Sequence, residues 1–150
     1  MPVRKKIPET DTPDIYTADT KTKTAAPLFV SPVSAGFPSP AEDFVELSLD
    51  LNTYLVKHPA ATFYVRVKGT SMVGANIHEG DLLLVDRALE PRDNAIVIGV
   101  INGEFTVKRI RSIKGELFLV PENPGFKPIK ITGEQDFHVW GVVSYVIHKA

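Results

Sequence analysis

The chain has 150 residues, a net charge of −1, a pI near 6.4 and 43% hydrophobic residues. This length and apolar content predict one domain with a real core, and the balanced charge excludes a global basic field for nucleic acid. The absence of cysteine excludes disulfides, a thiol nucleophile and thiolate metal sites, and it is compatible with a cytoplasmic protein. No apolar run reaches the roughly eighteen residues of a membrane span, and no secretory signal is recognised.

The N-terminal residues 1–27 are rich in Thr, Pro, Lys and Asp and contain few large apolar residues. Such a segment buries too little apolar surface to offset the entropy of ordering it, so we predict a flexible arm. The short apolar stretch Leu28-Phe29-Val30 is able to add as a strand to a sheet edge. We expect a flexible arm over residues 1–35 and a β domain over residues 36–150.

Two short helices are predicted at the start of the folded part. Ser39-Pro40-Ala41-Glu42 is typical of a helix start, because Ser caps, Pro suits the first position and Glu completes a capping box. The apolar face of this helix would consist of Phe44, Val45 and Leu47. A second short turn over residues 51–55 repeats the helical spacing and ends before His58-Pro59.

From residue 62 onward the pattern is that of β structure. The expected strands cover residues 62–68, 81–86, 95–101, 104–110, 116–120, 129–131 and 139–147. Asn102-Gly103 between two of these runs is a strong hairpin signal, and Lys114-Gly115 predicts the next turn. Many short strands and few helices predict a mostly β fold, a compact barrel-like set of antiparallel strands with short N-terminal helices.

Gly69-Thr70-Ser71-Met72 follows the first of these strands. The ordinary interpretation is a turn, because Gly takes unusual backbone angles and the hydroxyls bond nearby backbone groups. The alternative is a serine held at the rim of a sheet with its hydroxyl available as a nucleophile.

Lys108 is the candidate base for such a serine. Strand alternation places it on one face with Thr106 and Ile110, and both faces of this strand carry large apolar residues. Burial of a lysine lowers its pKa, and a neutral amine is able to act as a general base. The alternative is a lysine whose stem packs while its ammonium group reaches water.

Other chemistry is less attractive. A Ser-His-Asp triad of Ser71, His78 and Asp81 is conceivable, but triad partners normally come from separate elements. The four histidines are scattered and lack metal-ligand spacing, and Gly-rich phosphate loops are absent. We therefore predict no metal site and no cofactor.

Three features together resemble the self-cleaving Ser–Lys proteins of the bacterial DNA-damage response, the LexA/UmuD family. They are Ala35-Gly36, Gly69-Thr70-Ser71-Met72 and the run from Glu104 to Arg109. Gly36 and Ser71 are 35 positions apart, and Ser71 and Lys108 are 37 apart. The likeness covers roughly residues 28–147. It is closest to UmuD-type members, because the 35 residues before Gly36 are too few and too polar for the helix-turn-helix domain of LexA-like repressors.

The resemblance implies a LexA C-terminal-like β-clip fold and a self-cleavage reaction. Ser71 would be the nucleophile and Lys108 the general base, the scissile bond would join Ala35 to Gly36, and the backbone N–H groups of Ser71 and Met72 would hold the oxyanion. Cleavage would be stimulated by a RecA filament on single-stranded DNA. Whether it occurs within one chain or across a dimer stays open.

The resemblance also implies partners. The truncated product would form a homodimer and act as accessory subunit of an error-prone, UmuC-type Y-family DNA polymerase in the SOS response, with the sliding clamp as a further partner. No direct reading of nucleic acid and no membrane contact is expected. Two alternatives stay open: a signal-peptidase-like enzyme, which calls for a membrane anchor, and a non-catalytic β binding module in which Ser71 and Lys108 are structural.

Overall fold

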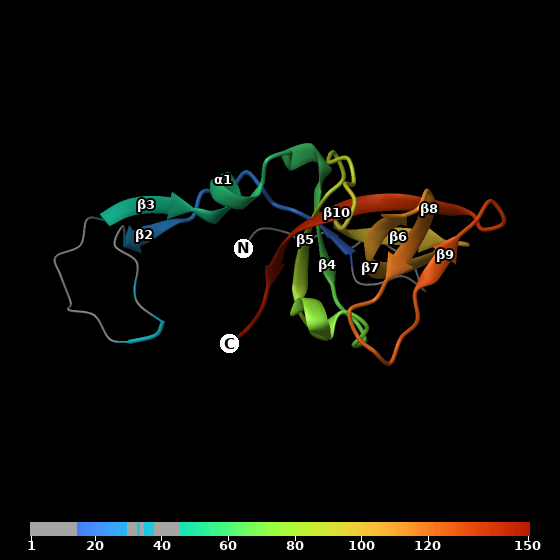
Figure 1. Ribbon diagram of the computed structural model, residues 1–150. Coiled ribbons are helices and arrows are strands. Elements are labelled where there is room, and N and C mark those ends of the chain that lie inside the picture. The colour runs from blue at the N-terminus through green and yellow to red at the C-terminus, as the bar shows by residue number, and fades with distance from the viewer. Residues whose placement is uncertain (1–14, 30–32, 34, 38–45) are drawn as a thin grey trace. The chain divides into compact units, whose positions relative to one another are not determined.

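The computed structural model describes residues 15–29, 33, 35–37 and 46–150 (Figure 1). The described residues form two compact units, one that joins residues 15–18 with residues 58–150 and one that contains the described residues between 19 and 57. The helix start predicted at residues 39–42, with Phe44 and Val45, lies outside the described residues. The expected division into residues 1–35 and 36–150 stays a prediction.

The first unit contains an antiparallel sheet of eight strands in the order β1-β4-β5-β10-β6-β7-β8-β9. The strands are β1 (Ile15–Thr17), β4 (Thr62–Arg66), β5 (Leu82–Asp86), β6 (Ile96–Ile101), β7 (Glu104–Ile113), β8 (Glu116–Val120), β9 (Ile129–Ile131) and β10 (Phe137–Ile147). The mostly β, antiparallel prediction is confirmed. The sheet is not a closed barrel, since its end strands β1 and β9 do not pair with each other in the described chain.

The long strand β10 joins the two halves of this sheet (Figure 1). Its first half pairs with β6, up to Val142 opposite Val97, and its second half pairs with β5, from Val142 opposite Asp86 to Ile147 opposite Leu82. Register shifts interrupt both ladders, and such irregularities bend a strand and increase its twist. One long strand thus connects the β1-β4-β5 part of the sheet to the β6-β7-β8-β9 part.

The two predicted hairpin turns are confirmed. Asn102 and Gly103 have φ of 48° and 82°, and Lys114 and Gly115 have φ of 52° and 76°. Positive φ at both central residues matches the twist of the flanking strands, which is why Asn-Gly is favoured there. These turns fix the register of β7 between β6 and β8, and thereby the face on which each β7 side chain lies.

β1 was not expected from the sequence, which predicts a flexible arm in this part of the chain. Ile15 pairs with Val65 of β4, and only 4% of its surface is exposed. A polar segment that buries too little to fold alone is able to add one strand to a sheet that already exists, because the sheet supplies both the backbone partners and the pocket. The composition of residues 1–27 therefore did not reveal this strand.

The second unit is a hairpin of β2 (Ala25–Phe29) and β3 (Glu46–Asp50), followed by α1 (Leu51–Leu55). The apolar stretch at Leu28 forms a strand as predicted, but it pairs with β3 in a separate two-stranded sheet and does not add to the edge of the large sheet. The prediction that Leu47 lies on a helix is wrong, because Leu47 lies on β3 and pairs with Leu28 of β2. The alternation of Leu47 and Leu49 with polar residues fits a strand equally well, and pairing with β2 decides between the two periods.

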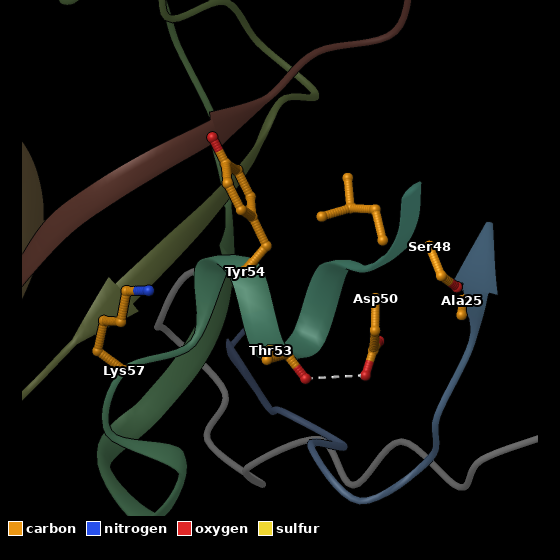
Figure 2. Close-up of a pocket in the computed structure, with 7 residues that line it drawn as sticks. Ala25, Ser48, Asp50, Thr53, Tyr54 and Lys57 are labelled. Atoms are coloured by element: carbon orange, nitrogen blue, oxygen red, sulfur yellow. Dashed lines mark hydrogen bonds between the residues drawn. The ribbon is translucent and has the colours of Figure 1, made fainter. Parts of the chain in front are cut away.

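α1 itself forms where predicted. The carboxylate of Asp50 caps it by accepting from the amide of Asn52, and the Thr53 hydroxyl donates to the same carboxylate at 3.1 Å. A shallow pocket lies between this helix and the hairpin (Figure 2), lined by Ala25, Ser48, Leu49, Asp50, Thr53, Tyr54 and Lys57. Two of its polar side chains, Asp50 and Thr53, are engaged with each other at the cap.

The other helical segments are single 3₁₀ turns, Pro59–Ala61 and Val73–Ala75, labelled η1 and η2. Within the described ranges, no helix is long and apolar enough to span a membrane. The core of the first unit has two buried clusters. One includes Ile15, Val65, Val67, Met72, Ile77, Leu83, Val85 and Ile98, and the other includes Val97, Ile110, Leu119 and Val142.

Candidate active site

Ser71 lies in the loop that follows β4. Gly69 has φ of +87°, a left-handed conformation that a residue without Cβ adopts at low cost, and it turns the chain away from the strand. Met72, directly after Ser71, is 3% exposed and belongs to the first core cluster. The buried methionine fixes the backbone, so the adjacent serine is held at a defined place at the end of the sheet.

Lys108 reaches this serine from β7. Its Nζ lies 2.9 Å from Oγ of Ser71, 2.8 Å from Oγ1 of Thr106 and 3.0 Å from the carbonyl oxygen of Val107. The structure therefore brings together the two side chains that the sequence singled out, from elements 37 positions apart. Thr106 lies on the same face of the strand as Lys108, as the alternation predicted.

The amine of Lys108 is partly buried. Burial lowers the pKa of Lys108 below its usual value of 10.5, and no carboxylate forms an ion pair with it among the described residues. A neutral amine has two N–H donors and one lone pair. In the neutral form of Lys108, with Thr106 and Val107 accepting its two donors, the lone pair would be left for the hydroxyl proton of Ser71, which is the arrangement a general base needs.

Backbone amides next to the serine are available. In the part of the chain that the structure describes, no hydrogen bond uses the N–H of Ser71 or of Met72, although the carbonyl oxygens of both residues accept bonds. Amides without an internal partner beside a nucleophile are suited to stabilise negative charge on a carbonyl oxygen.

The loop after β8 is hydrogen-bonded to the serine loop, which we define as residues 69–77. The amide of Glu122 donates to the Ser71 carbonyl at 2.8 Å, the amide of Gly74 donates to the Glu122 carbonyl at 2.7 Å, and Nδ2 of Asn123 donates to the Thr70 carbonyl at 2.9 Å. A Cβ at Gly74 would stand 2.6 Å from the Glu122 oxygen, so only glycine allows this approach. We call Glu122 and Asn123 the backbone clamp of the serine loop.

Arg109 holds the clamp in turn. Its Nε lies 2.6 Å from Oε1 of Glu122, and one terminal nitrogen donates to the Asn94 carbonyl at 2.7 Å. Lys108 and Arg109 are neighbours on β7, so they face opposite sides of the strand. Adjacent residues therefore serve the same serine, one directly and one through the clamp. The sequence carried no local signal for Gly74 or Glu122, because they meet only in the folded chain.

The triad that the sequence left open is not assembled. Nε2 of His78 lies 2.9 Å from Oδ1 of Asn76, and the buried carboxylate of Asp81 lies 2.9 Å from Nδ1 of His148. Burial by itself raises the pKa of Asp81, but the hydrogen bonds from the His78 amide and the His148 ring outweigh it and lower the pKa. This cluster ties the C-terminal residues to the turn before β5. Within the described residues, no three His, Asp or Glu side chains gather as metal ligands.

Ala35 and Gly36 belong to the second unit, in the connection from β2 to β3. Both residues are exposed, and no heavy atom lies within 4 Å of a Cβ built on Gly36. An exposed bond between two small residues is accessible to a protease active site.

An antiparallel β sheet with a half-buried lysine hydrogen-bonded to a serine is the arrangement expected of a Ser–Lys peptidase-like protein. The family model described as Peptidase S24-like matches residues 27–144, and the chain belongs to this family.

Several relatives are similar over most of their length. Protein SamA of Salmonella typhimurium is 45% identical over 85% of this chain and 88% of its own. Protein ImpA of Escherichia coli is 44% identical over 82% of this chain and 83% of its own. The LexA repressor of Bordetella petrii is 39% identical over 87% of this chain but only 57% of its own length. The resemblance to the LexA/UmuD family is thereby confirmed.

Proposed function

We propose that this protein is a UmuD-type, self-cleaving serine peptidase that cuts its own Ala35–Gly36 bond. The observation that supports this most directly is the 2.9 Å contact between Nζ of Lys108 and Oγ of Ser71, in a setting that lowers the pKa of the lysine. Membership of the Peptidase S24-like family supports the same reaction.

In the proposed reaction, Lys108 takes the hydroxyl proton as Ser71 Oγ attacks the carbonyl carbon of Ala35. The amides of Ser71 and Met72 stabilise the negative charge on the carbonyl oxygen. Lys108 then passes the proton to the nitrogen of Gly36, the peptide bond breaks, and an ester joins Ala35 to Ser71. Water hydrolyses this ester, which gives the carboxylate of Ala35 and restores the serine.

The proposal includes the cellular role that the resemblance implies. A RecA filament on single-stranded DNA would favour the cleavable arrangement, which is a population shift between two states. The truncated product would join a UmuC-type Y-family polymerase in SOS mutagenesis and would also meet the sliding clamp. These steps belong to the cytoplasm, where the replicating DNA lies. The similarity to SamA, ImpA and MucA, of which MucA of Escherichia coli is 41% identical, supports this role.

A homodimer is part of the same proposal. Residues 143–147 of β10 pair only with β5 in the described chain, so the other side of this segment is a free strand edge. Tyr145, Val146 and Ile147 are 39%, 37% and 43% exposed on it. A free edge with apolar side chains is able to pair with a second copy.

The test of the peptidase is the mass of the purified protein after incubation at mildly alkaline pH, alone and with activated RecA. We expect a cut between Ala35 and Gly36 whose rate rises with pH, because the neutral fraction of Lys108 grows. Ser71→Ala and Lys108→Ala should each abolish the cut. Lys127→Ala, which changes an exposed lysine, should be cut at the wild-type rate.

The competing function is a non-catalytic β binding module in which Ser71 and Lys108 are structural. It requires an unchanged mass under every condition, with and without RecA. A cut that survives Ser71→Ala would also contradict the proposed dyad, because it would come from another protease.

A further inference from the structure

β1 attaches the N-terminal segment to the unit that carries Ser71 and Lys108. It runs antiparallel to β4, with Ile15 opposite Val65 and Thr17 opposite Phe63. Ile15 is 4% exposed, whereas Thr17 is exposed. The attachment therefore combines a short backbone ladder with one buried side chain.

The pocket of Ile15 is continuous with the packing behind the nucleophile. Ile15 belongs to the same buried cluster as Met72 and Ile77, which lie on the two sides of η2 in the serine loop. The cluster also contains Val65 and Val67 from the end of β4. A β-branched apolar side chain fills this site at the edge of the sheet.

The proposed scissile bond lies between the paired strands in the chain. β1 and β2 precede Ala35-Gly36 in the chain, and their partners β4 and β3 follow it. Cutting the bond therefore leaves two strand pairings between the N-terminal fragment and the rest of the protein.

The two pairings differ in how much apolar surface they bury. A two-stranded hairpin by itself is marginally stable, and the paired residues Leu28 and Leu47 are 41% and 56% exposed. β1 adds to a large sheet and buries Ile15 almost completely. β1 and β2 are linked in one fragment. When one of these strands is paired, the link therefore keeps the other at an effective concentration of about millimolar near its own partner strand.

We propose that the edge of β4 is a strand-binding site for this chain's own N-terminal segment, and that Ile15 keeps residues 1–35 attached after the Ala35–Gly36 bond is cut. This inference rests on the proposed self-cleavage. Release of the fragment is then a separate step from hydrolysis. It uncovers β4 as an edge strand with an open pocket for a β-branched side chain.

The test makes the cut without using the protein's own activity. The full chain carries Ser71→Ala and the recognition sequence of an outside protease, inserted between Ala35 and Gly36. After digestion, gel filtration at micromolar concentration measures how much of the fragment, residues 1–35, elutes with residues 36–150. Repeated runs over time measure the rate at which the fragment dissociates. Because Ser71 is absent, failure of the proposed self-cleavage does not affect the result.

Three variants locate the anchor. Ile15→Asp should release the fragment at least about tenfold faster than the parent, and hydrogen exchange of the β4 amides should rise about tenfold even in the uncut chain. Thr17→Asp, which changes an exposed residue of the same strand, should release the fragment at the parent rate. Ile15→Val keeps a β-branched side chain and should retain the fragment.

Two results would overturn the proposal. One is a parent fragment that separates as fast as the Ile15→Asp fragment. The other is β4 amide exchange in the uncut chain that is unchanged by Ile15→Asp. Hydrogen exchange at β6 and β7, which lie away from β4 in the sheet order, shows that the variants remain folded.

Discussion

At the scale of residues, Lys108 is held by three oxygen atoms, those of Ser71, Thr106 and Val107, without an ion pair among the described side chains. Burial lowers the pKa of Lys108. At neutral pH the folded protein therefore either keeps a poorly solvated ammonium group at Lys108 or releases a proton from it. Either outcome costs stability, and under the proposed function the neutral amine is the form that acts as the base.

We predict that Lys108→Met raises the melting temperature at pH 7. Between the lowered folded pKa and the unfolded value of about 10.4, the unfolded chain binds more protons than the folded chain, so wild-type stability rises with pH. The increase in melting temperature caused by Lys108→Met should therefore be largest at pH values below this window and shrink as pH rises through it. Thermal melts of both proteins from pH 6 to pH 10 measure this difference.

Lys127→Met serves as the control, because it removes an exposed lysine and should leave the melting temperature nearly unchanged at every pH. An advantage of Lys108→Met that stays constant with pH would contradict a lowered pKa at Lys108. A variant less stable than wild type at pH 7 would show that the hydrogen bonds of Lys108 outweigh its desolvation.

At the scale of elements, η2 and the loop after β8 form one assembly that positions the serine. Gly74 and Glu122 approach so closely that a Cβ at Gly74 would lie 2.6 Å from a backbone oxygen. Arg109 fixes Glu122 from β7, next to the strand position of Lys108. The geometry of the dyad therefore depends on two loops that β7 holds together.

We predict that Gly74→Ala displaces the serine loop. The extra methyl group meets backbone, which yields less easily than a side chain, so we expect a loss of about 1–3 kcal/mol in the free energy of unfolding. Self-cleavage should slow by at least about tenfold, because small displacements of a nucleophile are costly. Urea unfolding and cleavage assays measure the two effects.

Gly133→Ala is the matched control, because no heavy atom lies within 4 Å of the place that its added methyl group would occupy, and its φ is not in the left-handed region. It should change neither stability nor cleavage. Equal behaviour of the two alanine variants would mean that the clamp does not position Ser71.

At the scale of the whole molecule, β10 beyond Val142 pairs with β5 alone among the described residues, and the proposed dimer uses its other edge. Ile147 and Ile113 are 43% and 42% exposed, so they have nearly equal exposure at different places. Ile147 lies on the free segment of β10, whereas Ile113 ends β7 opposite Glu116 of β8.

We predict that Ile147→Lys shifts the protein from dimer to monomer and that Ile113→Lys does not. A lysine on an edge strand opposes pairing with a second strand because its charge would have to be desolvated. Sedimentation velocity over a range of micromolar concentrations measures the change. A dimer that persists in Ile147→Lys, or dissociates equally in both variants, would place the interface elsewhere.

The sequence by itself determined the features that depend on neighbours along the chain. Alternation and continuous apolar runs predicted the strands from residue 62 onward, and Asn102-Gly103 predicted its hairpin, because left-handed backbone angles restrict the residues that fit. The same alternation placed Thr106 and Lys108 on one face. The helical assignment failed at Leu47, whose surroundings fit both a helix and a strand.

Only the tertiary structure decided contacts between distant segments. It joined Ile15 to Val65, Gly74 to Glu122 and Asp81 to His148, none of which has a local signature in the sequence. It also brought Lys108 to 2.9 Å from Ser71, which the residue types and their spacing suggested but did not fix. The physical reason is that local patterns set the direction of each side chain, whereas packing of the sheet sets which side chains meet.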